Sequence, residues 1–150
     1  MSEAASQSTP PAEGVFKASA DSHVRAVAKG VTWRVIGTLD TFLWSWLITH
    51  EPITAGSIAS TEVFTKIALF YLHERLWRVL KFAPDSHLRS LAKAVSWRVV
   101  GSLDTFVLGL IFTGSGKYAI SIASAEALTK IALYYVHERA WRRVRWGRLG

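Results

Sequence analysis

Hydrophobic residues are concentrated in four stretches of the chain, and short polar segments separate them. At 1.5 Å per residue, helices over these stretches would reach about 25 to 29 Å, close to the minimum for crossing a hydrocarbon core. The chain turns sharply after the first and third stretches. The pattern therefore predicts two hairpins of transmembrane helices, over residues 31–49, 53–71, 95–113 and 119–135.

The two predicted hairpins are copies of one unit. Residues 21–82 align with 85–146 without a gap, at the constant offset that separates Asp40 from Asp104, and about half of the paired positions are identical. The fold class predicted is an all-α integral membrane four-helix bundle of two tandem hairpins, related by a parallel pseudo-two-fold axis. Residues 1–20 are rich in Ser, Ala and Pro and predict a disordered cytoplasmic tail.

Basic residues gather at one end of this bundle. Of the 18 lysines and arginines, all but Lys66, Lys117 and Lys130 lie in the tail, the central linker, the C-terminal segment or the helix ends beside them. With two crossings per unit these regions face one compartment, which the positive-inside rule makes the cytoplasm. The prediction is a multi-pass protein of the bacterial inner membrane with both termini cytoplasmic. We expect the bilayer and its anionic headgroups to be the main partner.

Four tryptophans fall at these basic helix ends, where indole rings favour the headgroup layer. We predict that they anchor the bundle at the membrane interface: Trp33, Trp77, Trp97 and Trp141.

One stripe of the second helix in each unit is identical between the copies and is predicted to face the bundle interior. Together with an aspartate in each first helix, it brings ionisable groups into the membrane. These residues are Asp40, Glu62 and Lys66, repeated as Asp104, Glu126 and Lys130. We expect one cluster per unit, and glycines at 37 and 101 to allow a second helix to approach closely.

This charged cluster has two interpretations. It either locks the helices together or provides a proton or ion pathway, because charges at bilayer depth need partners and often serve a function. A soluble amphipathic four-helix bundle is the alternative to a membrane fold, and the charges within the spans favour it. The end-to-end separation of cations and tryptophans favours the membrane.

A repeated histidine motif follows each stripe, as His73, Glu74, Arg75 and His137, Glu138, Arg139. It lacks the second histidine four residues later that a zinc helix needs, so no metal site is predicted. At a helix end in the headgroup layer, these side chains are expected to meet terminal carbonyls and lipid phosphates. A remote alternative is that His73 and His137 together ligate a haem.

No nucleophile and base pair, phosphate loop or metal set is recognisable, and the chain has no cysteine. We therefore expect no catalytic residues and no enzyme. The net charge of +7 is explained by membrane-flanking cations, so nucleic acid is not an expected partner.

The repeated pattern of Thr32, Trp33, Arg34, Gly37 and Asp40, followed by Glu62, Lys66 and the histidine motif, resembles a bacterial family of predicted membrane proteins, domain of unknown function 2061, in two tandem copies. The resemblance implies an inner-membrane location and no particular activity. We expect a non-enzymatic protein with a structural or assembly role, in a homodimer or a larger membrane complex. A small ion- or proton-coupled transporter or channel is the alternative.

Overall fold

The structure is a computed structural model that describes residues 22–82 and 86–148, and over these residues it is all-helical, as predicted. Its four helices are α1 (His23–Thr49), α2 (Pro52–Val79), α3 (His87–Thr113) and α4 (Gly116–Arg143). The predicted tail, residues 1–20, lies outside the described residues.

Local sequence signals set the helix ends. The Ser22 and Ser86 side chains cap α1 and α3 by accepting hydrogen bonds from the backbone two residues into each helix. At the other end, His50 and Gly114 take left-handed backbone conformations that stop the helices and start the turns. Both helices end where the apolar pattern ends, at residues 49 and 113.

The helices are longer than the apolar stretches predict. Each contains 27 or 28 residues and is therefore about 40 Å long. The additional turns lie at the basic end, where α2 and α4 continue through the histidine motifs. This length is comparable to a bilayer with its headgroup regions.

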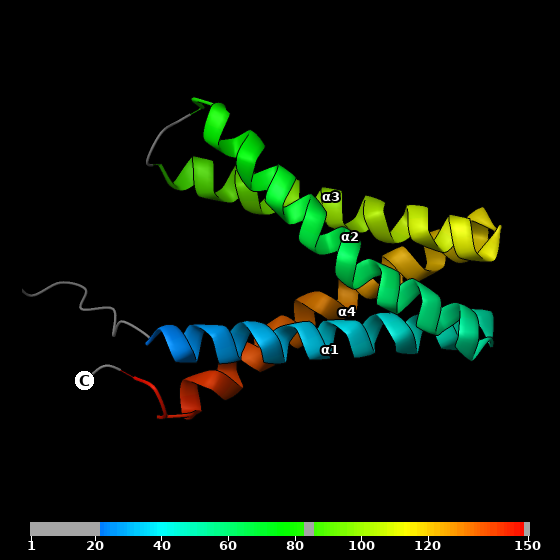
Figure 1. Cartoon of the computed structure of the whole chain (residues 1–150), viewed down its shortest axis with the longest axis horizontal. Helices are drawn as coiled ribbons and strands as arrows, with labels where there is room; N and C mark the ends of the chain where they lie inside the picture. Colours follow the sequence, from blue (N-terminus) through cyan, green and yellow to red (C-terminus); the bar gives the residue numbers. More distant parts are fainter. Residues whose placement is uncertain (1–21, 83–85, 149–150) are drawn as a thin grey trace, which may run out of the picture.

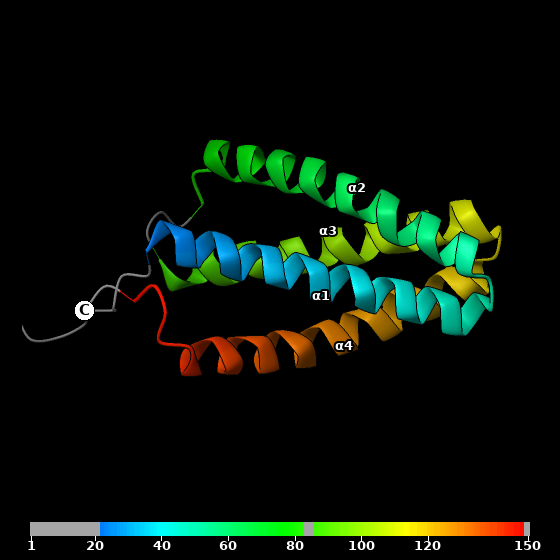
Figure 2. The ribbon, with the colours of Figure 1, turned by 60° about the horizontal axis from the view of Figure 1, so that its bottom comes forward.

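The helices form a ring in which each one packs against two neighbours (Figures 1 and 2). The two hairpin turns lie together at one end. At the other end α1 stays beside α4 and α2 stays beside α3, while these two pairs move apart (Figure 1). The molecule is therefore closed at its turn end and splayed at its basic end.

Polarity is inverted relative to a water-soluble bundle. The buried side chains include Asp40, Glu62, Glu126 and both motif histidines, whereas valine, leucine, isoleucine and phenylalanine are exposed along all four helices. A small apolar core of Ile58, Leu108 and Ile122 lies near the turns. Two helices, α3 and α4, are long and apolar enough to cross a membrane.

Candidate functional site

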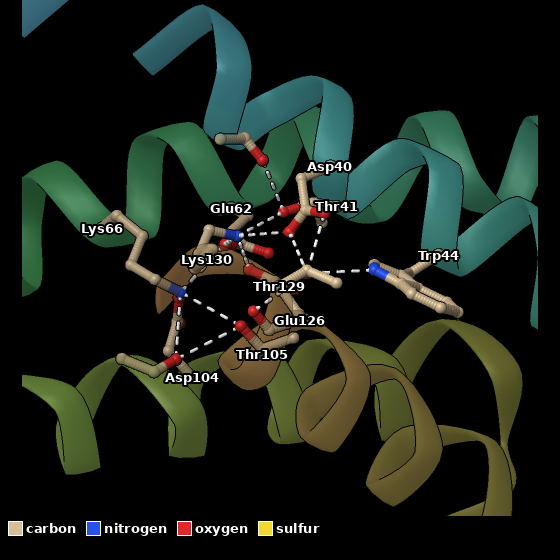
Figure 3. A network of polar contacts seen from close by, with 12 residues as sticks. Asp40, Thr41, Trp44, Glu62, Lys66, Asp104, Thr105, Glu126, Thr129 and Lys130 are labelled. Atoms are coloured by element: carbon tan, nitrogen blue, oxygen red, sulfur yellow. Dashed lines mark hydrogen bonds and ion pairs between the residues drawn. The ribbon is translucent and has the colours of Figure 1, made fainter. Parts of the chain in front are cut away.

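The six ionisable residues predicted to lie inside the membrane meet at the centre of the bundle (Figure 3). Each helix contributes: the aspartates come from α1 and α3, and the Glu–Lys pairs from α2 and α4. The predicted inward stripe of α2 and α4 is confirmed, since none of its members is exposed. We call this group the charged cluster: Asp40, Glu62, Lys66, Asp104, Glu126 and Lys130.

One half of the charged cluster is centred on Lys66. Its ammonium nitrogen lies 2.8 Å from Asp104 Oδ2 and 3.1 Å from Glu62 Oε1. It also donates hydrogen bonds to the carbonyl of Gly101 (3.0 Å) and the hydroxyl of Thr105 (3.2 Å). These four oxygens surround the ammonium group, so this half is a compact ion pair with hydrogen-bonded support.

The other half is centred on Lys130 and is looser. The Lys130 ammonium group contacts Glu126 and donates to Thr41 (3.0 Å), but it lies 3.8 Å from both Asp40 Oδ2 and Glu62 Oε1. Because Lys130 reaches Glu62 of the other repeat, it joins the two halves into one network.

Asp40 is held mainly by a hydroxyl group. Thr129 donates to both Asp40 carboxylate oxygens at 2.9 and 3.0 Å, and the Trp44 indole N–H donates to Thr129 at 3.0 Å (Figure 3). In the other half, Thr65 donates to Asp104 at 2.9 Å.

The expected grouping by repeat is wrong. Asp40 contacts Thr129 and Lys130 of the second unit, and Asp104 contacts Lys66 of the first. The reason is the ring arrangement, since the aspartate face of each first helix looks towards the second helix of the other hairpin. The ion pairs therefore connect the two repeats instead of closing each hairpin.

The glycines at 37 and 101 lie where each lysine reaches across to the other repeat. A Cβ atom added at Gly37 would lie 3.7 Å from Cε of Lys130, and one at Gly101 would lie 3.6 Å from Cε of Lys66. Both distances are ordinary van der Waals contacts, so each glycine lies beside a lysine stem from the other repeat and an alanine would also fit there. The two glycines do not bring a helix backbone closer, as the sequence had suggested.

A central cavity of about 540 Å³ lies between the four helices. Glu62, Glu126, Lys66 and Lys130 line its inner part, and the apolar layer of the core closes the bundle beyond them, towards the turns. The cavity extends towards the splayed end, where its lining residues are Trp33, Arg34, Phe70, Trp97, Arg98 and Tyr134.

Two buried carboxylate oxygens beside this cavity accept no hydrogen bond from a donor group of the described residues. They are Oε2 of Glu62 and Oε2 of Glu126, whose residues are only 6% and 3% exposed. The charged cluster holds four carboxyl groups and two ammonium groups, so it carries two surplus acids. Buried acids without matching cations favour the uptake of protons or of another cation.

The motif histidines form a second polar layer nearer the splayed end. The Trp77 indole N–H donates to His73 Nε2 (3.1 Å) and to Ser96 (3.1 Å), whose hydroxyl lies 2.8 Å from the same nitrogen. The other pair repeats this network with Trp141, His137 and Thr32, at 2.9 to 3.1 Å. Each network joins helices of different repeats.

Ion pairs and arginine caps surround these networks. Glu74 pairs with Lys93 at 2.7 Å, and Glu138 with Lys29 at 2.6 Å. These groups lie beyond the predicted membrane spans. The hydrogen bond from Lys29 lowers the pKa of Glu138, and burial together with the Lys29 charge lowers the pKa of His137.

The arginine caps explain how α2 and α4 end. Arg89 donates to the carbonyls of Leu80 (2.8 Å) and Phe82 (2.7 Å), past the end of α2. Its counterpart Arg25 donates to carbonyls at the end of α4, including that of Val144 at 2.9 Å. The terminal carbonyls therefore bind arginines from the neighbouring repeat, whereas we expected the motif's own His and Arg. Arg75 and Arg139 instead lie over Tyr71 and Tyr135.

The tryptophans predicted as interface anchors point between helices. Trp77 is buried, and Trp33, Trp97 and Trp141 are half-buried. Trp33 packs edge-on against Tyr134, and Trp97 packs edge-on against Phe70. An anchor needs an indole ring facing lipid, so Trp77 is not one; its ring stabilises the α2–α3 contact.

The haem alternative does not fit this geometry. His73 belongs to the α2–α3 pair and His137 to the α1–α4 pair, which diverge at this end (Figure 1). Moreover, each Nε2 already accepts a hydrogen bond from an indole. No group of three or more His, Cys, Asp or Glu side chains in residues 22–82 and 86–148 is arranged to hold a metal ion.

Sequence reasoning missed the hydroxyl groups of the site. Four threonines at residues 41, 65, 105 and 129 bind the charged cluster. The signal was present, because each is identical in both repeats and stands next to an aspartate or lysine of the cluster. Trp44 carried no such signal, since its counterpart is Leu108.

The structure thus belongs to the class of all-helical proteins with an apolar exterior and a polar centre. The chain belongs to the family described as predicted membrane protein (DUF2061), whose model matches it twice, over residues 27–78 and 91–142. This confirms the resemblance seen in the sequence, including its two copies. No curated protein and no solved structure matches the chain.

Proposed function

We propose that this chain is a non-enzymatic, four-span protein of the bacterial inner membrane whose central cavity carries protons or small ions across the bilayer. Both termini lie in the cytoplasm in this proposal, because nearly all cations outside the charged cluster lie at the splayed end. The apolar surface of all four helices supports the membrane setting, since large exposed apolar surfaces require lipid or a partner.

The observation that carries the transport proposal is the position of the charged cluster on a cavity wall. A purely structural lock is best buried in a tightly packed core, where every polar atom has a partner. Here Glu62 and Glu126 line an open cavity, and each keeps an unpaired oxygen. Ionisable groups reached from one side of a membrane are suited to load and release protons.

The apolar layer near the turns supplies the other requirement of a regulated pathway. Ile58, Leu108 and Ile122 separate the cavity from the turn end. In this proposal the cavity loads from the cytoplasmic side, and passage requires that this layer open. Such opening would require the pairs α1–α4 and α2–α3 to separate near the turns as they do at the splayed end (Figure 1).

A structural role is the second candidate, and the contacts between repeats favour it. Asp40 to Lys130 and Asp104 to Lys66 connect the hairpins, as a polar lock would. In that role the protein would hold a homodimer or a larger membrane complex together and would carry no flux.

Ion flux separates the two candidates. The full chain is reconstituted in liposomes that contain a pH-sensitive dye, and a pH gradient is applied with the membrane potential clamped. We expect faster decay of the gradient than in empty liposomes. The Glu62→Gln, Glu126→Gln double variant should abolish this excess, whereas Glu51→Gln, in the exposed turn, should retain it.

A wild-type protein that is folded, inserted and without flux would reject transport and leave the structural role. Helical circular dichroism and a monodisperse elution profile in detergent provide the folding control for each variant. Reporter fusions at the two ends test the topology separately, and opposite locations of the ends would reject a four-span arrangement.

A further inference from the structure

We propose that the central cavity binds a small organic cation with an ammonium group, and that this cation replaces one of the protons carried by Glu62 and Glu126. The inference deepens the proposed function by naming the class of substrate, and it therefore rests on that function. Two carboxylates at the inner end of a wide cavity and aromatic rings at its outer end are the features that carry it.

The inner end supplies the negative charge. Glu62 and Glu126 come from α2 and α4, line the cavity and are nearly fully buried, and each has one buried oxygen that accepts no hydrogen bond from the described residues. Lys66 contacts Glu62 and Lys130 contacts Glu126, but both lysines also pair with an aspartate, so two acids remain in surplus over the two ammonium groups. An incoming ammonium group would balance this surplus negative charge.

The outer end supplies aromatic walls. Trp33 with Tyr134, and Trp97 with Phe70, form two edge-to-face pairs with ring centroids 5.3 and 5.2 Å apart. All four residues line the cavity, one from each helix. Aromatic faces attract organic cations and bind their apolar substituents, and tryptophan does so most strongly.

The size of the cavity favours an organic molecule over a bare ion. A volume of about 540 Å³ is within the range of small-molecule sites. Among the described residues, no three His, Cys, Asp or Glu side chains are grouped so that they could hold a metal ion. The two arginines of the lining, at 34 and 98, are exposed at the outer end, where long cationic side chains reach lipid phosphates.

The exchange of one proton for one organic cation leaves the net charge of the cavity unchanged. With both glutamates protonated the charged cluster is neutral, since two aspartates face two lysines. A monovalent ammonium ion then enters as one proton leaves, and the cavity keeps its net charge. Binding should therefore weaken as the pH falls, by about tenfold per pH unit where one proton is released per cation.

The test is equilibrium binding to the full chain in detergent or nanodiscs. The probe is benzyltrimethylammonium, with benzyl alcohol as the neutral probe and benzenesulfonate as the anionic one. Tryptophan fluorescence reports occupancy, and calorimetry in two buffers of different ionisation enthalpy reports proton release. We expect saturable binding of the ammonium probe alone, with release of about one proton.

Two variants locate the site. Glu62→Gln with Glu126→Gln should weaken binding by at least about tenfold and abolish proton release. Trp33→Leu with Trp97→Leu should weaken binding roughly threefold to tenfold and leave proton release unchanged. Glu51→Gln is the matched control and should bind as the wild type does. If the double glutamate variant does not fold, the pH dependence of the wild type decides.

Some outcomes overturn the inference. Binding of benzenesulfonate in preference to the cation would assign the cavity to anions held by the arginines. Proton flux in liposomes without saturable cation binding would reject the organic cation and leave the proposed function intact. Absence of both flux and binding in the folded protein would reject the two together.

Discussion

The two halves of the charged cluster have the same residue types but different geometry. Lys66 lies 2.8 Å from Asp104, whereas Lys130 lies 3.8 Å from Asp40. In the looser half, the Thr129 hydroxyl donates a hydrogen bond to Asp40, and the Trp44 indole N–H donates one to the Thr129 hydroxyl. The position equivalent to Trp44 holds Leu108, which is buried in the apolar core.

Two copies of one sequence repeat therefore do not form two equivalent sites. One of the positions that differ between the repeats, tryptophan at 44 against leucine at 108, lies beside the half in which the lysine is farther from its aspartate. Lys130 contacts the glutamates of both repeats, whereas Lys66 contacts Asp104 and the glutamate of its own repeat. Variants at equivalent positions should therefore have unequal effects.

The largest expected contrast is between the two aspartates. Asp104→Asn removes the nearest partner of the Lys66 ammonium group and should cost about 3 kcal/mol of unfolding free energy. Asp40→Asn should cost about 1 kcal/mol, because Lys130 keeps Glu126 and the asparagine oxygen still accepts from Thr129. Thermal unfolding in detergent measures both, and equal costs would contradict the inequality of the halves.

The next largest contrast is between two equivalent positions near the hairpin turns, Gly109 in the second repeat and Ser45 in the first. A Cβ atom added at Gly109 would lie 3.0 Å from the Ala119 backbone, so Gly109→Ala should cost about 1–3 kcal/mol. Its counterpart is Ser45, which is fully buried with a hydroxyl that has no partner in the described chain. Ser45→Ala should be neutral or stabilising. The two melting temperatures should move in opposite directions or by clearly different amounts.

Trp44→Leu makes the looser half resemble the tighter one in sequence. It removes the hydrogen bond to Thr129 and should cost about 1 kcal/mol beyond the effect of lost packing. Combining it with Thr129→Val in a double-mutant cycle isolates that bond. A coupling energy of zero would show that Trp44 acts by packing alone.

The smallest expected effect concerns the α1–α4 contact at the splayed end. The pKa of His137 is lowered from 6.5, so the unfolded chain binds more protons than the folded one just below that pH. The contact should contribute fully above pH 6.5 and weaken as the pH falls through the lowered value. Melting temperatures at about pH 7.5 and about pH 5.5 measure the change.

His137→Gln is the corresponding variant, and it should reduce this pH dependence. His23→Gln, at an exposed position near the start of α1, is the control and should leave it unchanged. If the control alone reduced the pH dependence, the sensitive group would be at the N-terminus of α1 and not in the tryptophan–histidine network.

The existence of four helices and the identity of the inward residues could be predicted from the chain alone. Four apolar stretches separated by short polar segments placed the helices and their turns, although the helices extend beyond these stretches at the basic end. Identity between the repeats marked the inward stripe and the six residues of the charged cluster, since both copies place the same positions in the same environment.

Which of these residues contact one another could not be predicted without the packing of the helices. Each aspartate pairs with the lysine of the other repeat, Asp40 with Lys130 and Asp104 with Lys66. This pairing depends on the order of the helices around the ring, which the spacing of residues along the chain does not specify. The cavity between α1–α4 and α2–α3, and the burial of Trp77 between helices, depend on how those pairs diverge. Helix packing is a relation between surfaces, so a pattern that defines each surface does not fix which one it contacts.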